Sequence, residues 1–340
     1  MKNIQTLTAG LLAAALLAGC TAPAAVSGTT TTAAEASAQS EPLRVVTTIF
    51  PAYDWVRNVA GAQADVLDLT LLLDGGVDLH SYQPSAQDIA AIADCDLFVY
   101  VGGASDAWVD EALQGASNPD RQVLNLMELL GSRVYEEETV EGMEPEDHDH
   151  AEAEDHDHET DEHIWTSLRN AAELSAAIGD ALGRLDPAHA ADYTANAAAY
   201  GEKLGALDAD YAAVVEAAPC KTLLFGDRFP FRYLVEDYGL SYYAAFPGCS
   251  AETEASFETV AFLAGKVAEL DLPAVLTIEG SDGKIARTIQ QSAGGDRAVL
   301  TLDSLQATTT ADAAAGTSYL SVMQQNLDVL RQALGAGEAA

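Results

Sequence analysis

Residues 221–246 read KTLLFGDRFPFRYLVEDYGLSYYAAF, and this stretch decides the fold. The apolar run 222–225 predicts a buried strand, 230–238 predicts a helix that begins at a proline, and 241–246 predicts a second strand. Strands that alternate with helices in this way are typical of βαβ units, in which the strands are parallel.

The same alternation continues on both sides of this stretch. Further strands are expected at 43–49, 66–72, 97–101, 274–278 and 298–302, and further helices at 53–61, 85–93, 253–270, 284–292 and 317–334. Residues 187–217 predict one linking helix, about 45 Å long at 1.5 Å per residue. The predicted fold class is therefore α/β, with two parallel-sheet lobes at 43–186 and 218–336 and a ligand site in the cleft between them.

The chain is strongly acidic, with 16 Lys and Arg against 53 Asp and Glu in 340 residues and a formal charge of −37. Without a basic stripe, such a chain is a poor candidate for binding nucleic acid, and cations are the expected partners. Residues 136–162 hold 15 acidic residues and no Lys or Arg, which predicts a solvated loop. Two Asp-His-Asp-His units in this loop could collect zinc as an accessory site, the alternative being a solubilising insertion. Their histidines are His148, His150, His156 and His158.

The first 20 residues are typical of a targeting segment. Lys2 gives a positive start, and the apolar run 7–17 is too short to span a bilayer. The segment ends in LAGC, which resembles the lipobox of bacterial lipoprotein signals and implies an acylated Cys20. Residues 21–42 then predict a flexible tether on the extracytoplasmic face of the cell membrane.

Three cysteines remain if Cys20 carries a lipid. Cys95 follows a helical pattern and precedes a strand, so we expect a small core residue there. Cys220 and Cys249 lie at the edges of consecutive strand–helix–strand elements, and we favour a disulfide between them. The alternative is that one of the two is a thiolate metal ligand.

Polar side chains at the expected carboxyl ends of strands are the candidate site residues. His80 follows the second strand, and His163 lies where the acidic loop meets the next helix. Asp227 and Asp303 each follow a strand of the second lobe, with Glu279 as the alternative carboxylate; a helix cap or ion pair is the other interpretation of Asp227. Two imidazoles with one or two carboxylates suit zinc, and also manganese or iron.

Several motifs resemble those of the metal-binding lipoproteins of bacterial ABC importers, the cluster A-I (ZnuA-like and TroA-like) solute-binding family. They are VVTTIFP at 45–51, DLHSYQPS at 78–85, EHIW at 162–165 and DYTAN at 192–196, and the resemblance extends over 43–334. Zinc members of the family often carry an acidic, His-rich loop. The resemblance implies a monomeric binding protein, not an enzyme, that captures zinc, or alternatively manganese, and delivers it to an ABC permease. His80 and His163 match its first two ligand motifs.

The third ligand motif departs from the family. In the family, a His or Glu precedes a helix that ends in Tyr-Gly-Leu. This chain has Tyr-Gly-Leu at 238–240, but the family's spacing places Arg228 at the ligand position, and arginine cannot bind a cation. We therefore predict its neighbour Asp227 as the third ligand, with Asp303 in the LDSL motif as the fourth. The segment GCSAETE at 248–254 matches no ligand motif, so Cys249 and Glu252 stay as alternatives. A metal-dependent hydrolase and a surface adhesion module with a structural metal are the other functions considered.

Overall fold

Four parallel strands form the sheet of the first lobe, in the order β2-β1-β3-β4. They are β1 Leu43–Thr47, β2 Leu67–Leu71, β3 Leu97–Tyr100 and β4 Gln122–Asn125. The computed structural model describes residues 42–115, 117–144, 160–250 and 254–337. All four residues of β3 are buried, as expected for a strand covered on both faces.

The second lobe repeats this arrangement with the strand order β6-β5-β7-β8. Its strands are β5 Thr222–Arg228, β6 Ser241–Phe246, β7 Ala274–Ile278 and β8 Ala298–Leu302. All are parallel, and their order along the chain matches that of the first sheet. The prediction of two α/β lobes with parallel sheets is confirmed.

Helices cover these sheets and connect them. Those of the first half are α1 Phe50–Ala60, α2 Ala86–Asp94, α3 Val109–Gln114, α4 Leu126–Leu130, α5 Leu168–Leu185 and α6 Ala190–Ala217. Those of the second half are α7 Arg232–Tyr238, α8 Phe257–Glu269, α9 Lys284–Ala293, α10 Thr310–Ala314 and α11 Tyr319–Ala333. The short α3, α4 and α10 were not predicted, because five or six residues are too few to show a helical period.

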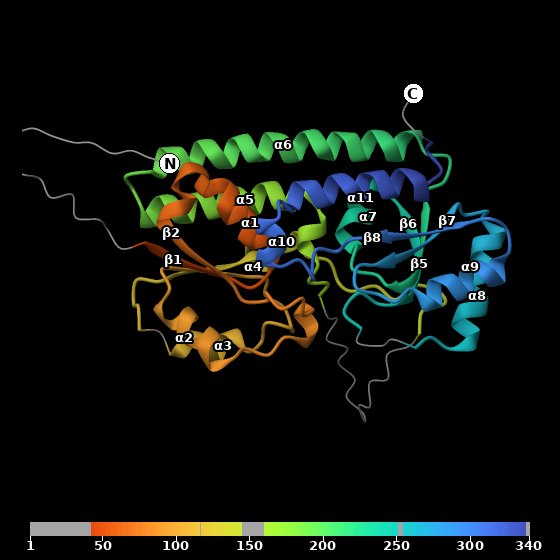
Figure 1. Cartoon of the computed structure of the whole chain (residues 1–340), viewed down its shortest axis with the longest axis horizontal. Helices are drawn as coiled ribbons and strands as arrows, with labels where there is room; N and C mark the ends of the chain where they lie inside the picture. The colour runs from red at the N-terminus through yellow and green to blue at the C-terminus, as the bar shows by residue number, and fades with distance from the viewer. Residues whose placement is uncertain (1–41, 116, 145–159, 251–253, 338–340) are drawn as a thin grey trace, which may run out of the picture. The chain divides into compact units, whose positions relative to one another are not determined.

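The long helix α6 is the linking helix that the sequence predicts, although it begins at Ala190 rather than at residue 187. Figure 1 shows it running alongside α5 and α11, and it packs on both. Tyr193, Leu204 and Tyr211 lie on its buried face. In the described part of the chain, no helix is both long enough and apolar enough to cross a membrane.

Buried hydrogen bonds also join segments from the two halves of the chain. The indole Nε1 of Trp165 donates to the carbonyl of Ser304 at 2.7 Å, and the hydroxyl of Tyr319 donates to the carbonyl of Trp165 at 2.7 Å. Both aromatic side chains are fully buried. Because Trp165 lies two residues after His163, these contacts fix the chain next to a candidate ligand.

The fold depends on the buried face of α6, so we expect Leu204→Ala to lower the free energy of unfolding by about 2–4 kcal/mol through cavity formation. Lys203→Ala, at an exposed position of the same helix, is the control and should change stability by less than about 0.5 kcal/mol. Urea denaturation of both variants measures the difference. Equal stabilities would show that α6 contributes little to the core.

Candidate metal centre

His80 lies on the short 3-10 helix η2 (Leu79–Ser81), beyond the carboxyl end of β2. Asp78 is the N-cap of this helix, and its Oδ1 accepts a hydrogen bond of 3.0 Å from the backbone N–H of His80. In the ring, Nδ1 lies 2.8 Å from the hydroxyl of Ser105 and 3.4 Å from Oε2 of Glu162. A proton on Nδ1 can be donated to the Ser105 hydroxyl and is favoured by the nearby Glu162 carboxylate, which leaves the Nε2 lone pair free to bind a cation.

His163 immediately precedes the short 3-10 helix η4 (Ile164–Thr166) and is fully buried. Oδ1 of Asp161 lies 2.8 Å from its backbone nitrogen and 3.0 Å from its ring Nδ1. Burial alone would lower the pKa of His163, but the carboxylates of Asp161, Asp78 and Glu162 together outweigh burial, so this pKa lies above the usual value for histidine. The hydroxyl of Tyr233 fixes the segment by donating to the Asp161 carbonyl at 2.7 Å. As in His80, Nε2 is the nitrogen left to bind a cation.

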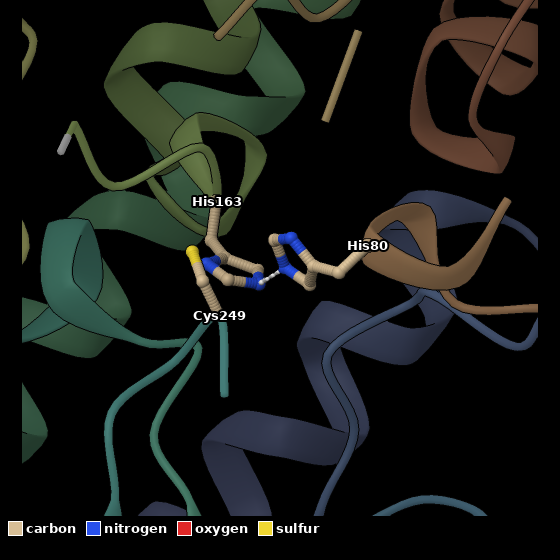
Figure 2. A group of neighbouring side chains, drawn as sticks. All are labelled: His80, His163 and Cys249. Carbon is tan, nitrogen blue, oxygen red and sulfur yellow. Dashed lines mark hydrogen bonds between the residues drawn. The ribbon is translucent and has the colours of Figure 1, made fainter. Parts of the chain in front are cut away.

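The two rings direct their Nε2 atoms at each other, 3.1 Å apart (Figure 2). With both protons on Nδ1, two lone pairs would face each other and repel, so a proton or a metal ion is needed between them. Two nitrogen ligands of one tetrahedral zinc ion, each at about 2.0–2.1 Å, lie about 3.3 Å apart. The observed spacing therefore fits a single metal ion bound by both rings.

Cys249 is the third member of this group. Its Sγ and one nitrogen from each of His80 and His163 all lie within 4.8 Å of one another, the one such group of three found among the described residues. Figure 2 shows the three side chains arriving from separate segments. Burial, together with the carboxylate of Glu137, raises the pKa of the Cys249 thiol well above its usual value.

The predicted disulfide between Cys220 and Cys249 is wrong, because both are free thiols. Cys220 comes just before β5 begins, and Cys249 comes just after β6 ends. Since β5 and β6 are parallel neighbours, the two cysteines lie at opposite edges of the sheet. A strand of about six residues spans about 20 Å, whereas the Cα atoms of a disulfide lie within about 7 Å of each other.

Asp227, predicted as the third ligand, does not belong to this group. Its Oδ2 accepts a hydrogen bond of 2.6 Å from the hydroxyl of Thr277, and its Oδ1 accepts one of 3.0 Å from the backbone N–H of Arg228. The Arg228 guanidinium bonds Oδ2 of Asp78 at 2.7 Å and the carbonyl of Ser250 at 3.3 Å. Burial would raise the pKa of Asp78, but the charges of Arg228 and His80, with their hydrogen bonds, hold it below the usual range. An ion pair between the lobes thus occupies the position where the resemblance places a third ligand.

Asp303 and its alternative Glu279 also lie outside the group. Oxygens of Glu279 accept hydrogen bonds from the backbone N–H of Ser304 at 2.6 Å, from its hydroxyl at 2.5 Å, and from the backbone N–H of Gln306 at 3.1 Å. Oδ1 of Asp303 accepts one of 2.8 Å from the backbone N–H of Leu305, while burial and Glu279 raise the pKa of Asp303 to about 6. Both carboxylates therefore shape the loop that follows β8.

Ser105 and Gly103, which the sequence analysis did not select, complete the support of His80. The backbone N–H of Ser105 donates to Oε1 of Glu162 at 2.7 Å. Burial would raise the pKa of Glu162, but its bonds with His80 and Ser105 lower it. A Cβ on Gly103, whose φ is +84°, would lie 2.4 Å from Oε1 of Glu162. The pair of glycines after β3 was the sequence signal for this close approach.

The ends of the acidic segment 136–162 are packed, contrary to the prediction of a wholly solvated loop. Oε1 of Glu137 accepts a hydrogen bond of 2.9 Å from the backbone N–H of Cys249. Glu138 pairs with Arg232 at 3.1 Å. Residues 136–144 therefore fasten the first lobe to the second beside the metal site.

A cavity of about 270 Å³ opens beside His80 and Cys249. It is lined by His80, Ala104, Ser105, Thr160, Glu162 and Cys249. Thr160 is the first described residue after the His-rich part of the acidic segment. The predicted Cys20, Glu252, His148, His150, His156 and His158 lie outside the described residues, as do the signal 1–20 and residues 21–41 of the predicted tether 21–42.

Two parallel-sheet lobes, a linking helix and two facing imidazoles define a two-lobed binding protein for a metal ion. The model of one family, described as zinc-uptake complex component A, periplasmic, matches residues 45–333. The chain belongs to this family, which confirms the resemblance to ZnuA-like solute-binding proteins.

Individual relatives agree with this assignment. The chain is 34% identical over 292 residues to the zinc-binding lipoprotein AdcA of Streptococcus pneumoniae serotype 4, covering 85% of this chain and 55% of that protein. It thus spans about half the length of that relative. It is 29% identical over 305 residues to the high-affinity zinc uptake system protein ZnuA of Bacillus subtilis, covering 89% and 91%. The crystal structure of the zinc-bound ZnuA-like domain of S. pneumoniae AdcA superposes with a TM-score of 0.67 and 30% identity, covering 86% and 98%.

Asp106 supports the turn that carries Ser105. It is 3% exposed, and its Oδ2 accepts a hydrogen bond of 3.0 Å from the backbone N–H of Gly102, while Oδ1 has no partner. Burial raises the pKa of this carboxyl to about 7. Because the folded-state pKa lies above the unfolded value, the stabilisation from a protonated Asp106 is lost as the pH rises through 7.

Asp106→Asn removes the titrating carboxyl and keeps an oxygen that can accept the hydrogen bond from the backbone N–H of Gly102. We expect the free energy of unfolding of the variant, relative to the wild type, to rise by about 3 kcal/mol between pH 5 and pH 8. Urea denaturation at both pH values measures this change. Asp110→Asn, at an exposed site nearby, is the control and should show no such trend. A pH-independent difference for Asp106→Asn would mean that the carboxyl is ionised throughout this range.

Proposed function

We propose that this chain is an extracytoplasmic solute-binding protein that captures Zn²⁺ between its lobes and delivers it to an ABC permease. The observation that carries the proposal is the pair of Nε2 atoms 3.1 Å apart. Each ring has an oxygen partner at Nδ1, the arrangement typical of histidines that bind a metal.

Zinc is the cargo that these donors favour. Imidazole nitrogen suits zinc, whereas manganese prefers carboxylate, carbonyl and water oxygens. The predicted carboxylate ligands Asp227 and Asp303 are engaged in hydrogen bonds away from the rings. Relatives named as zinc-binding proteins support the same choice. We therefore place Zn²⁺ before the alternative Mn²⁺.

The location and the partners of the protein are also part of the proposal. The family description includes the word periplasmic, and one relative is named a lipoprotein. Together with the motif LAGC at 17–20, these names support a lipid anchor on Cys20 at the outer face of the cell membrane. A monomer that meets an ABC permease from that side would release the ion directly into the import path.

Replacing either imidazole by His80→Ala or His163→Ala should weaken zinc binding by about 100-fold or more, since each removes one of few ligands. Titration against a competing chelator measures the affinity of the tight site and masks weaker ones. His189→Ala is the matched control, because His189 caps the far end of α6 and pairs with Asp186 at 2.6 Å. Unchanged affinity in both ligand variants would exclude the proposed site.

The accessory role of the His-rich tract can be tested by replacing residues 145–159 with a Gly-Ser linker of equal length. This change spares Glu137 and Glu162, which contact Cys249 and His80. The number of zinc ions bound per chain should fall to one, with the affinity of the remaining site within about threefold of the wild type. If the tight site disappears as well, the tract supplies one of its ligands.

A further inference from the structure

We propose that the thiolate of Cys249 is the third ligand of the bound metal, replacing the His or Glu that the family supplies from β5. The inference rests on the proposed function, because it completes the ligand set of the same site. The ligand set becomes two imidazole nitrogens and one sulfur.

The position of Cys249 carries this inference. Its Sγ lies with one nitrogen of each imidazole inside a group 4.8 Å across. Sulfur and nitrogen ligands of one tetrahedral zinc ion lie about 3.5 Å apart, at bond lengths of about 2.3 and 2.0–2.1 Å. The group is therefore slightly wider than a zinc-bound one, and we expect the cysteine side chain to rotate so that Sγ moves closer to the two nitrogens when the ion binds. The thiol proton passes to solvent when the metal–sulfur bond forms.

The loop that carries Cys249 is held at the site from two sides. Oε1 of Glu137, in the first lobe, accepts a hydrogen bond of 2.9 Å from the backbone N–H of Cys249. The guanidinium of Arg228 donates a hydrogen bond of 3.3 Å to the carbonyl of Ser250. It donates another, of 2.7 Å, to Asp78, which is the N-cap of the helix that carries His80. One guanidinium thus ties the loop of one ligand to the loop of another. Arg228, which cannot bind a cation itself, is therefore a positioning residue for Cys249 and His80.

A close approach on the other side of this loop supports the same arrangement. A Cβ on Gly248 would lie 2.8 Å from the carbonyl of Phe229 and 3.2 Å from Cε1 of His163. Any other residue at this position would push the cysteine loop away from the imidazole. The sequence Gly-Cys therefore lets the loop pack directly on His163.

A thiolate makes the site selective for metals that accept sulfur. Zn²⁺ and Cd²⁺ bind thiolate well, whereas Mn²⁺ prefers oxygen ligands. Three protein ligands leave the fourth position of a tetrahedral ion open towards the cavity of about 270 Å³ that Cys249 lines. An open position lets another ligand attack the ion and take it over during delivery.

Cobalt spectroscopy of the mature chain, kept reduced, tests the role of the sulfur. With one equivalent of Co²⁺, the wild type should show a thiolate-to-cobalt charge-transfer band and the visible bands of tetrahedral Co²⁺. Cys249→Ser should lose the charge-transfer band and weaken zinc binding by at least about tenfold. Cys220→Ser is the matched control: Cys220 is also a partly buried free thiol of the second lobe, and this variant should keep both properties.

Two results would overturn the inference. One is a wild-type cobalt spectrum without a charge-transfer band, which needs no variant to fold. The other is a folded Cys249→Ser variant that keeps the band and the zinc affinity. If that variant binds zinc normally while His80→Ala and His163→Ala do not, the sulfur ligand is excluded and the proposed function stands. If none of these variants loses affinity, the proposed function itself fails.

Discussion

The rest of the site depends on two ring nitrogens that face each other at 3.1 Å. Such a contact is stable only with a proton or a metal ion between the rings, because two lone pairs otherwise repel. Binding of a metal ion by both rings also needs a hydrogen-bond acceptor at each Nδ1, so that both rings offer an unprotonated Nε2. Asp161 fills that role for His163, and Ser105 with Glu162 fills it for His80. The carboxylates beside the two rings thus orient the imidazoles, which in the proposed site bind the ion.

The fold provides this contact although 83 residues separate the two histidines. Parallel sheets place every strand's carboxyl end at one edge, and the site lies where the edges of the two lobes meet. Trp165 then fixes His163 through a buried bond to Ser304, a second-lobe carbonyl. A buried indole with its N–H satisfied contributes packing as well as a hydrogen bond, whereas the pair of Asp78 and Arg228, each side chain 20% exposed, joins the lobes through charge.

The sequence was sufficient for the fold, because apolar runs define the strands. It also selected His80, which follows a strand, and His163, which follows the acidic segment, and the structure brings these two imidazoles together. It was insufficient for the third ligand. Neighbouring residues of a strand point to opposite faces, so choosing between Asp227 and Arg228 requires the register. The pairing of β5 with β6 is irregular between Phe225 and Arg228, and such an irregularity redirects side chains without a sequence signal. The position of Cys249 depends in turn on Glu137, which is distant in sequence.

The acidity of the chain acquires a more specific role from this arrangement. A Zn²⁺ ion bound by two neutral imidazoles and one thiolate keeps a charge of +1, whereas two carboxylates in place of the thiolate would neutralise it. In this protein Asp161 and Glu162 lie behind the imidazoles and provide compensating charge without occupying the metal. Charge in that position favours entry of a cation but adds no metal–oxygen bond that must break on release. A carrier must bind and then let go, and separating the electrostatic attraction from the coordination bonds serves both requirements.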